Sequence, residues 1–274
     1  MASSIASLVR IRPSMAPLAL LLFLAPGLHA DAFSELTDRA VEPLRANGRP
    51  APTPLEVVGP ATRATGPRQF DPGEPGTRAS TKLFELTADV DASRTETAYS
   101  HRTKIRRKDG VYLFDCSGMV NWMLQRVAKQ AYESLDRERP VAASYVRVIK
   151  AAPSSRARGG WQQIAVIADV EPGDVFAWRR PKDWPKGGNS GHVGVVVAKP
   201  EPVPHYANAW VVRVADSTRW QHQDDTRSGD ETGFGMGTLL FVTDDDGHPI
   251  GYGWFGSESG GYYETDVVFG RVHG

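Results

Sequence analysis

Phe114-Asp115-Cys116-Ser117-Gly118-Met119-Val120 is the stretch that decides how the chain is interpreted. It opens the clearest helical pattern in the sequence, because apolar residues from Met119 to Ala128 recur along one stripe of a 3.6-residue period. Asp115 stands where a helix N-cap is expected, so Cys116 falls in the first turn. The pattern therefore predicts a helix that begins at a thiol.

A thiol at the start of a helix is favoured in its ionised form, since unpaired backbone N–H groups and the helix dipole stabilise a thiolate. The same N–H groups can hold an oxyanion. Gly118 keeps the turn narrow enough for a substrate to approach the sulfur. Cys116 is the only cysteine, which excludes an intramolecular disulfide and a cysteine-rich zinc site. The alternative for Cys116 is a small buried hydrophobic residue without chemistry.

The remaining elements predict an α+β fold, with helices first and antiparallel strands afterwards. Further helices are expected around residues 82–86 and 142–152. Short segments rich in β-branched and aromatic residues, bounded by Gly, Pro or Asp, indicate strands at 174–178, 192–197, 210–215, 238–243, 250–255 and 267–272. Asp245-Asp246-Gly247 lies between two of these strands and predicts a hairpin turn. A calcium loop is the alternative for these acids, but the alternating Asp-x-Asp-x spacing of its ligands is missing.

A cysteine nucleophile needs a base, which any of seven histidines could supply. His192 is favoured, because Ser190-Gly191 leads it to the start of an apolar strand and gives it a rigid support. His101, shortly before the cysteine, is a second candidate. The others are interpreted as leader, terminal or solvated surface residues, namely His29, His205, His222, His248 and His273.

An acid can be matched to His192 by strand periodicity. Val212, Val214 and Asp216 share one face of their strand on a period of two, as do His192 and Gly194 on theirs. Antiparallel pairing of the two strands would bring Asp216 beside His192, where its carboxylate could fix the tautomer of the ring. The alternative is that Asp216 ends a strand with ordinary turn composition.

Three tetrapeptides together carry a resemblance to a known family. Asp115-Cys116-Ser117-Gly118, Pro172-Gly173-Asp174-Val175 and Gly191-His192-Val193-Gly194 follow one another as in the NlpC-type cell-wall cysteine peptidases of the papain-like superfamily. The likeness spans residues 99–218. It implies a papain-like fold with N-terminal helices packed on a central antiparallel sheet. It also implies the roles of the site residues, with Cys116 as nucleophile, His192 as base, Asp216 as the orienting residue and Tyr99 near the oxyanion.

The resemblance further implies an exported cysteine hydrolase that cleaves an amide bond in peptidoglycan stem peptides and needs no metal or organic cofactor. Ser117 and Trp184 are expected to contact the substrate, Trp184 by stacking on a sugar or peptide from the loop before His192. Two alternatives stay open. One is a lipid acyltransferase or thioesterase, although relatives with that role place His before Cys. The other is a non-catalytic wall-binding module.

Composition and the N-terminus bound the partners and the compartment. The chain of 274 residues carries 32 basic and 32 acidic side chains, a balance that argues against a nucleic-acid partner. Residues 1–30 predict a signal peptide, with Arg10 and Arg12 before a short apolar run, which implies export to the periplasm or outside the cell and no membrane segment afterwards. Residues 31–78 predict a proline-rich disordered linker, and residues 79–274 the catalytic domain. Oligomeric state stays open.

Overall fold

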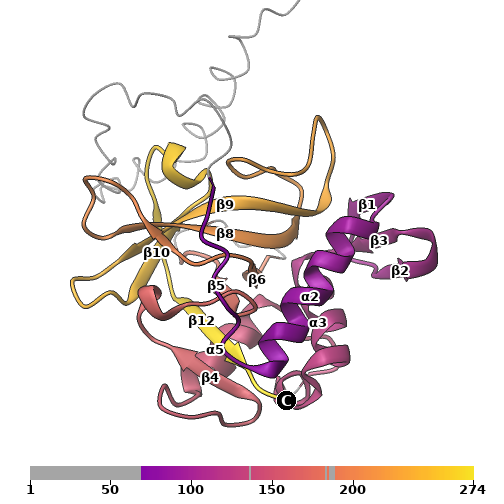
Figure 1. The fold of residues 1–274 in the computed structure, drawn as a ribbon, viewed down its shortest axis with the longest axis horizontal. Coiled ribbons are helices and arrows are strands. Elements are labelled where there is room, and N and C mark those ends of the chain that lie inside the picture. Colours follow the sequence, from indigo (N-terminus) through magenta and orange to yellow (C-terminus); the bar gives the residue numbers. More distant parts are fainter. Residues whose placement is uncertain (1–68, 136, 183, 185–188) are drawn as a thin grey trace, which may run out of the picture. The chain divides into compact units, whose positions relative to one another are not determined.

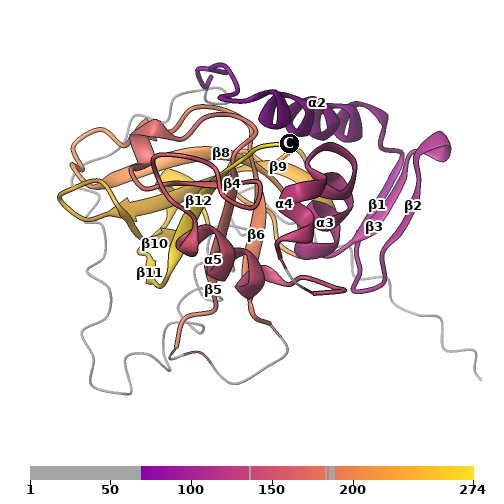
Figure 2. The ribbon, with the colours of Figure 1, turned by 90° about the horizontal axis from the view of Figure 1, so that it is seen from below.

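The structure is a computed structural model that describes residues 69–135, 137–182, 184 and 189–274 (Figures 1 and 2). The expected signal peptide and residues 31–68 of the expected linker lie outside the described residues. Within the described residues, no helix combines the length and the apolar character that a bilayer span requires.

A nine-stranded sheet with antiparallel pairing dominates the described residues. Its strand order is β11-β10-β9-β8-β6-β5-β12-β4, and β7 pairs with β8 beside this path. The strands are β4 (Trp161–Ile164), β5 (Val175–Arg179), β6 (Gly191–Val196), β7 (Glu201–Pro202), β8 (Ala209–Thr218), β9 (Gly233–Thr243), β10 (Pro249–Gly253), β11 (Tyr263–Glu264) and β12 (Val267–Val272). The turn between β9 and β10 confirms the hairpin expected at Asp245-Asp246-Gly247.

The sheet curls until strands from distant positions in its order meet. Trp178 on β5 stacks on Tyr252 of β10 with ring centroids 4.0 Å apart, although β6, β8 and β9 lie between these strands in the order. The enclosed face is filled by aromatic and branched side chains, including Phe176, Phe241 and Phe269. Such a closely packed interior excludes water and holds the strands rigidly in place.

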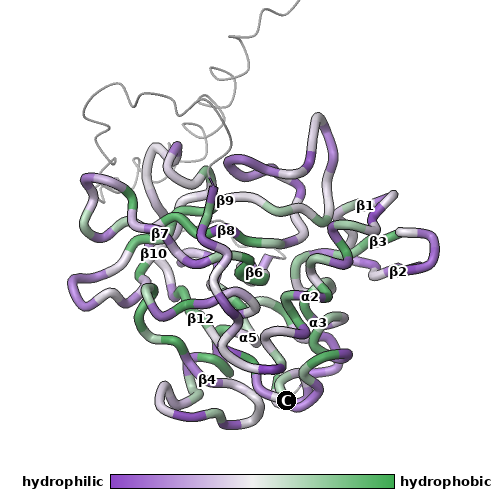
Figure 3. Tube along the Cα trace, viewed as in Figure 1, coloured by the Kyte–Doolittle hydropathy of each residue, from purple (hydrophilic) through white to green (hydrophobic). Residues whose placement is uncertain are grey.

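The opposite face of the sheet is covered by α-helices. These are α2 (Arg78–Ser93), α3 (Cys116–Val127), α4 (Lys129–Glu133) and α5 (Ala142–Ala151). Leu83, Met119 and Ile149 from three of them pack with Val193 and Val195 of β6 in one buried cluster. In Figure 3 the hydrophobic segments gather in the sheet and in α3, and the hydrophilic segments gather in the connecting loops. This packing places the start of α3 close to β6.

A small separate sheet precedes α3 and was not expected from the sequence. It joins β1 (Glu96–Tyr99), β2 (Lys104–Arg106) and β3 (Val111–Phe114) in the order β1-β3-β2. β1 and β3 are parallel, with Tyr99 paired to Phe114. Because Phe114 lies two residues before Cys116, this pairing holds Tyr99 near the start of α3.

The expected papain-like α+β fold, with N-terminal helices on a central sheet, is wrong. Among the described residues, strands hold more residues than helices, and one nine-stranded antiparallel sheet dominates over four α-helices. The expectation failed because β8 and β9 are 10 and 11 residues long, well beyond the six-residue segments that composition marked. Strands of that length let the sheet curl around a core of its own.

Candidate functional site

The start of α3 is built as the sequence predicts. Asp115 is the N-cap, and its Oδ1 accepts a hydrogen bond of 2.6 Å from the backbone N–H of Gly118. Cys116 is therefore the first residue of the helix, with 8% of its surface exposed. Among the described residues, the backbone N–H groups of Cys116 and Ser117 make no hydrogen bond. A thiol and two free backbone donors thus share one helix end.

His192 is the second residue of β6 and belongs to the face that lines the curled sheet. Its ring lies 5.0 Å from the Trp178 ring and 6.0 Å from the Phe176 ring, measured between centroids. Gly194 leaves the space that Phe176 occupies, because a Cβ there would come within 2.6 Å of that ring. Aromatic packing therefore fixes the imidazole, which is 8% exposed.

Asp216 lies beside His192 as strand periodicity suggested. β6 and β8 are antiparallel, with Val195 opposite Ala215 and Val196 opposite Val214. The Nε2–H of His192 donates to Asp216 Oδ2 over 2.7 Å. Cys116 raises the pKa of His192, which places the thiol near the imidazole. Since Nε2 is engaged by Asp216, Nδ1 is the ring nitrogen left for the sulfur.

The charges of the three groups support one another. Burial alone would lower the pKa of His192, but the Cys116 thiolate and Asp216 together raise it to about 9. Burial alone would raise the pKa of Asp216, but the imidazoles of His222 and His192 hold it well below its ordinary value. Near neutral pH the site therefore favours an imidazolium on His192 beside an ionised Asp216.

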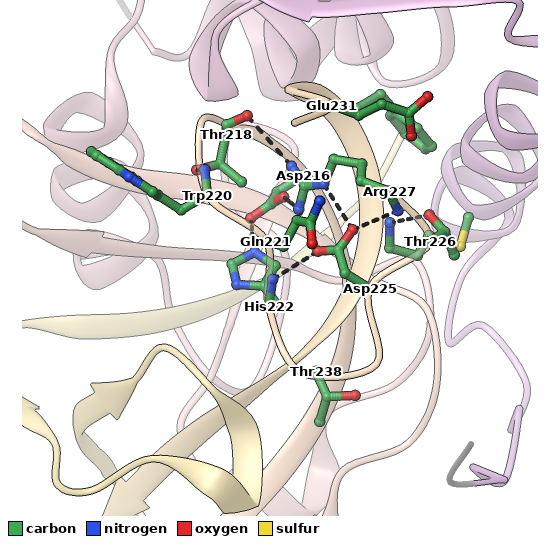
Figure 4. A network of polar contacts seen from close by, with 12 residues as sticks. Asp216, Thr218, Trp220, Gln221, His222, Asp225, Thr226, Arg227, Glu231 and Thr238 are labelled. Carbon is green, nitrogen blue, oxygen red and sulfur yellow. Dashed lines mark hydrogen bonds and ion pairs between the residues drawn. The ribbon is translucent and has the colours of Figure 1, made fainter. Parts of the chain in front are cut away.

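His222 also belongs to this site, although its loop position suggested a solvated surface residue. Its side chain is fully buried, and its Nε2 lies 2.7 Å from Asp216 Oδ2, the same oxygen that His192 binds. Figure 4 shows the ring beside the carboxylate, on the loop that follows β8. Two imidazoles therefore share one carboxylate oxygen.

Alternating glycines explain how that loop reaches Asp216. In the β8–β9 register Gly235 lies opposite Asp216 and Gly237 opposite Val214. A Cβ on Gly235 would come within 2.4 Å of Arg227, and one on Gly237 within 2.5 Å of His222. The Gly-x-Gly pattern at 235–237 was the signal in the sequence that could have located His222.

Arg227 and Asp225 complete the buried polar network of Figure 4. Arg227 donates from Nε and Nη2 to both carboxylate oxygens of Asp225, over 2.8 Å and 2.6 Å. Its Nη2 also lies 3.5 Å from Asp216 Oδ1, an ion-pair distance. Burial alone would lower the pKa of Arg227, but Asp225 and Asp216 raise it. The guanidinium thus adds a permanent positive charge beside Asp216.

Tyr99 and His101 lie next to the helix start. Burial and the nearby Cys116 raise the pKa of Tyr99 to about 12, and the Arg219 guanidinium lies 5.3 Å from the centre of its ring. His101, whose side chain is 72% exposed, bonds Asp115 Oδ2 through Nδ1 over 3.0 Å. The second candidate base therefore contacts the helix cap, whereas His192 is the described histidine whose pKa Cys116 raises.

The two expected substrate contacts have other partners in the structure. The Ser117 hydroxyl donates to Asp115 Oδ1 over 3.0 Å, within the cap. Trp184 contacts the Tyr263 ring at 5.3 Å. From there a row of rings runs through Tyr252 and Trp178 to His192. Trp184 therefore stands at the far end of an aromatic row from the imidazole.

A metal is a chemical alternative for two groups of side chains among the described residues. His192, Asp216 and His222 have donor atoms within 4.8 Å of one another. Their 2.7 Å nitrogen–oxygen distances are those of hydrogen bonds, and Arg227 already places a cation there. The second group, at the β9–β10 turn, is Asp244, Asp246 and His248. There Asp244 Oδ1 accepts the backbone N–H groups of Asp246 and His248, which accounts for the turn.

The chain is similar in sequence to a viral protein that has no assigned activity. No family model matches the chain. No solved structure matches it either. The chain is 31% identical over 180 residues to "Uncharacterized protein R653" of Acanthamoeba polyphaga mimivirus, a match that covers 58% of this chain and 77% of the viral protein. At that identity and coverage, the chain belongs to the same family as the mimivirus protein R653.

Proposed function

We propose that the chain is a cysteine hydrolase that cleaves an amide bond through a thioester on Cys116. The proposal is supported by the hydrogen bond between His192 and Asp216 and by the effect of Cys116 on the pKa of His192, three residues that come from elements far apart in sequence. A buried imidazole between a thiol and a carboxylate, at a helix start with free N–H groups, matches what nucleophilic catalysis by cysteine requires. An inert buried cysteine would need none of these partners.

In the first half of the reaction, the Cys116 sulfur attacks the substrate carbonyl carbon. The N–H groups of Cys116 and Ser117 hold the developing oxyanion. The C–N bond breaks as the His192 imidazolium gives its proton to the leaving amine. This step leaves an acyl group on the sulfur and a neutral imidazole.

In the second half, neutral His192 takes a proton from water, and the resulting hydroxide attacks the thioester carbonyl. The C–S bond breaks, the acid product leaves, and the thiolate and imidazolium are restored. Asp216 keeps Nε2 of His192 protonated, so that Nδ1 is the nitrogen that exchanges protons with sulfur, amine and water.

The substrate class rests on the resemblance of the three tetrapeptides to NlpC-type peptidases. It favours a peptide bond in peptidoglycan stem peptides, met outside the cytoplasm after export by residues 1–30. The test is mass spectrometry of muropeptides before and after incubation with the protein. The same measurement reports the position of the cleaved bond.

Cys116→Ala should lower turnover at least about a thousandfold, a typical cost of losing a nucleophile. His192→Ala should cost about as much, because the two residues act as a unit. His248→Ala is the matched control, since His248 also pairs with an aspartate but at the exposed β9–β10 turn. Digestion by Cys116→Ala at the wild-type rate would show that the assignment is wrong. Acylation of Cys116 by a lipid probe, without any muropeptide product, would overturn the substrate class.

A further inference from the structure

We infer that His222 is a positioning residue, which holds the Asp216 carboxylate in place and ionised and so sets the pH range in which Cys116 reacts. The inference rests on the proposed function, because it concerns the pair that Cys116 and His192 form. The contacts that the described residues make with His222 do not include Cys116, so we argue that His222 acts through Asp216.

The first support is that Asp216 has few donors for a fully buried carboxylate. Oδ2 accepts from His192 and His222, each over 2.7 Å, and among the described residues Oδ1 has no hydrogen-bond donor. Arg227 lies 3.5 Å from Oδ1. A buried carboxylate stays ionised only when hydrogen bonds or opposite charges replace its lost water. His222 therefore supplies one of two hydrogen bonds on which this anion depends.

The second support is the proton count on His222. Its Nδ1 faces the backbone carbonyl oxygen of Trp254 at 3.3 Å, and its Nε2 faces a carboxylate oxygen. Both partners can only accept hydrogen bonds, so both ring nitrogens must donate when both bonds are made. That is the doubly protonated, positively charged ring, placed against the carboxylate that orients His192.

The third support is the charge balance of the buried cluster. The groups that face His222 or Asp216 are His192 from β6, Asp225 and Arg227 from the loop after β8, and through His192 the thiol of Cys116. With both rings protonated and the thiol ionised, three positive charges meet three negative ones. Farther out, Glu231 acts on Arg227, and Arg227 acts on Arg94. Without the charge on His222, the reactive state of the cluster would carry an unbalanced negative charge.

The fourth support is that His222 is held before any substrate binds. Its backbone N–H donates to Asp225 Oδ2 over 2.8 Å, and its ring packs on the Trp254 ring with centroids 4.3 Å apart. Gly237 leaves its space. The bond to Asp225, the packing on Trp254 and the bond to Asp216 thus hold His222 in place, as expected for a residue that orients another.

The expected consequence follows from the sign of each interaction. Loss of His222 removes one donor and one positive charge from Asp216, which makes the carboxylate easier to protonate. The weakened anion then stabilises the His192 imidazolium less, and the imidazolium in turn stabilises the thiolate less. Cys116 should therefore need a higher pH to react.

The experiment measures alkylation of Cys116 by iodoacetamide in the intact protein, between about pH 5 and pH 9. This readout needs no substrate, and Cys116 is the only thiol. His222→Leu should lower the rate about tenfold at about pH 6, the effect of one lost hydrogen bond to a charged group, and shift the profile to higher pH. His222→Gln, whose side-chain N–H can still donate, should recover most of the rate. His248→Leu is the matched control and should keep the wild-type profile.

Each outcome separates the inference from the proposed function. A His222→Leu profile equal to that of the wild type would overturn the positioning role and leave the proposed function standing. Wild-type Cys116 that reacts no faster than a free thiol in the acidic range would overturn the proposed function itself. Should the leucine variant fail to fold, His222→Asn takes its place, because its shorter amide cannot reach Asp216. Equal profiles for the asparagine variant, the glutamine variant and the wild type would then contradict the inference.

Discussion

Asp174 and Asp216 are both aspartates without exposed surface, but their partners differ. Asp174 accepts from Arg271 Nε and Nη2 over 3.0 Å and 2.9 Å, and from the backbone N–H of Glu171. Asp216 accepts from two imidazoles. Burial raises the pKa of Asp174 despite Arg271, whereas the imidazoles lower the pKa of Asp216 despite burial. Equal burial therefore produces opposite shifts.

The difference distinguishes a structural ion pair, at Asp174, from a candidate functional site, at Asp216. Arg271 keeps its proton at every accessible pH, so its fork with Asp174 ties β12 to the turn before β5 and does nothing else. An imidazole can gain and lose a proton near neutral pH, so the partners of Asp216 can take part in chemistry. Burial of an acid does not by itself indicate function, and the titration range of its partners is the better guide.

Asp216→Asn should give the largest effect that distinguishes the two acids. Its amide can donate to the imidazole, which would stabilise the wrong tautomer and leave the imidazolium without its anion. Turnover, measured on muropeptides with the properly folded fraction, should fall by roughly a thousandfold or more. Asp174→Asn is the control. The turnover of its folded fraction should stay within a few-fold of the wild-type value. A loss of turnover as large as that of Asp216→Asn would show that the two aspartates do not differ in function.

Asp174→Asn should instead lower the free energy of unfolding. The amide has one oxygen where the carboxylate has two, so one of the two Arg271 hydrogen bonds loses its acceptor, and an unpaired buried donor costs about 1–3 kcal/mol. Urea unfolding followed by tryptophan fluorescence measures the change. The double variant Asp174→Asn, Arg271→Met removes both charges and should recover part of the loss. If the effects of the two single substitutions on the free energy of unfolding simply add in the double variant, the two side chains do not act as a pair.

Local pattern was enough to predict several elements of the structure. The stripe from Met119 predicted α3, and Asp115 caps it as expected. Strand periodicity predicted that Asp216 meets His192, because antiparallel pairing and a period of two are local rules. The catalytic roles of these residues stay predictions.

What local pattern could not supply was set by contacts between distant segments. The curl of the sheet depends on Trp178 meeting Tyr252, which lie more than seventy residues apart. His222 lies in a polar loop, whose composition predicts exposure to solvent. It is buried because Gly235 and Gly237 of β9 have no side chains and leave room for this loop. Trp184 packs on Tyr263 of an edge strand that composition did not mark, and its stacking on a substrate stays a prediction.

Acidification should act on the two aspartates with opposite signs. Asp216 has a folded pKa below its unfolded value of about 3.9, so its stabilising contribution is present above that value and is lost as the pH falls further. Asp174 has a raised folded pKa, so its contribution becomes more favourable as the pH falls through that pKa. The measurement is the unfolding free energy of wild type minus that of each Asp→Asn variant, from neutral pH to about pH 3. The two differences should change in opposite directions, and parallel curves would contradict the assigned causes.

The smallest effect is expected where the same chemical pair is exposed. His248 Nδ1 lies 3.2 Å from Asp244 Oδ2, with about half of each side chain exposed, so water competes for both groups. His248→Ala should leave both the thermal midpoint and the alkylation profile of Cys116 at their wild-type values, because Asp244 keeps its bonds to the backbone N–H groups of the turn. Scanning calorimetry and the iodoacetamide assay measure the two quantities. A clear change in either quantity would mean that an acid and an imidazole can affect stability or Cys116 reactivity without being buried. The difference between Asp174 and Asp216 would then need another explanation than their buried partners.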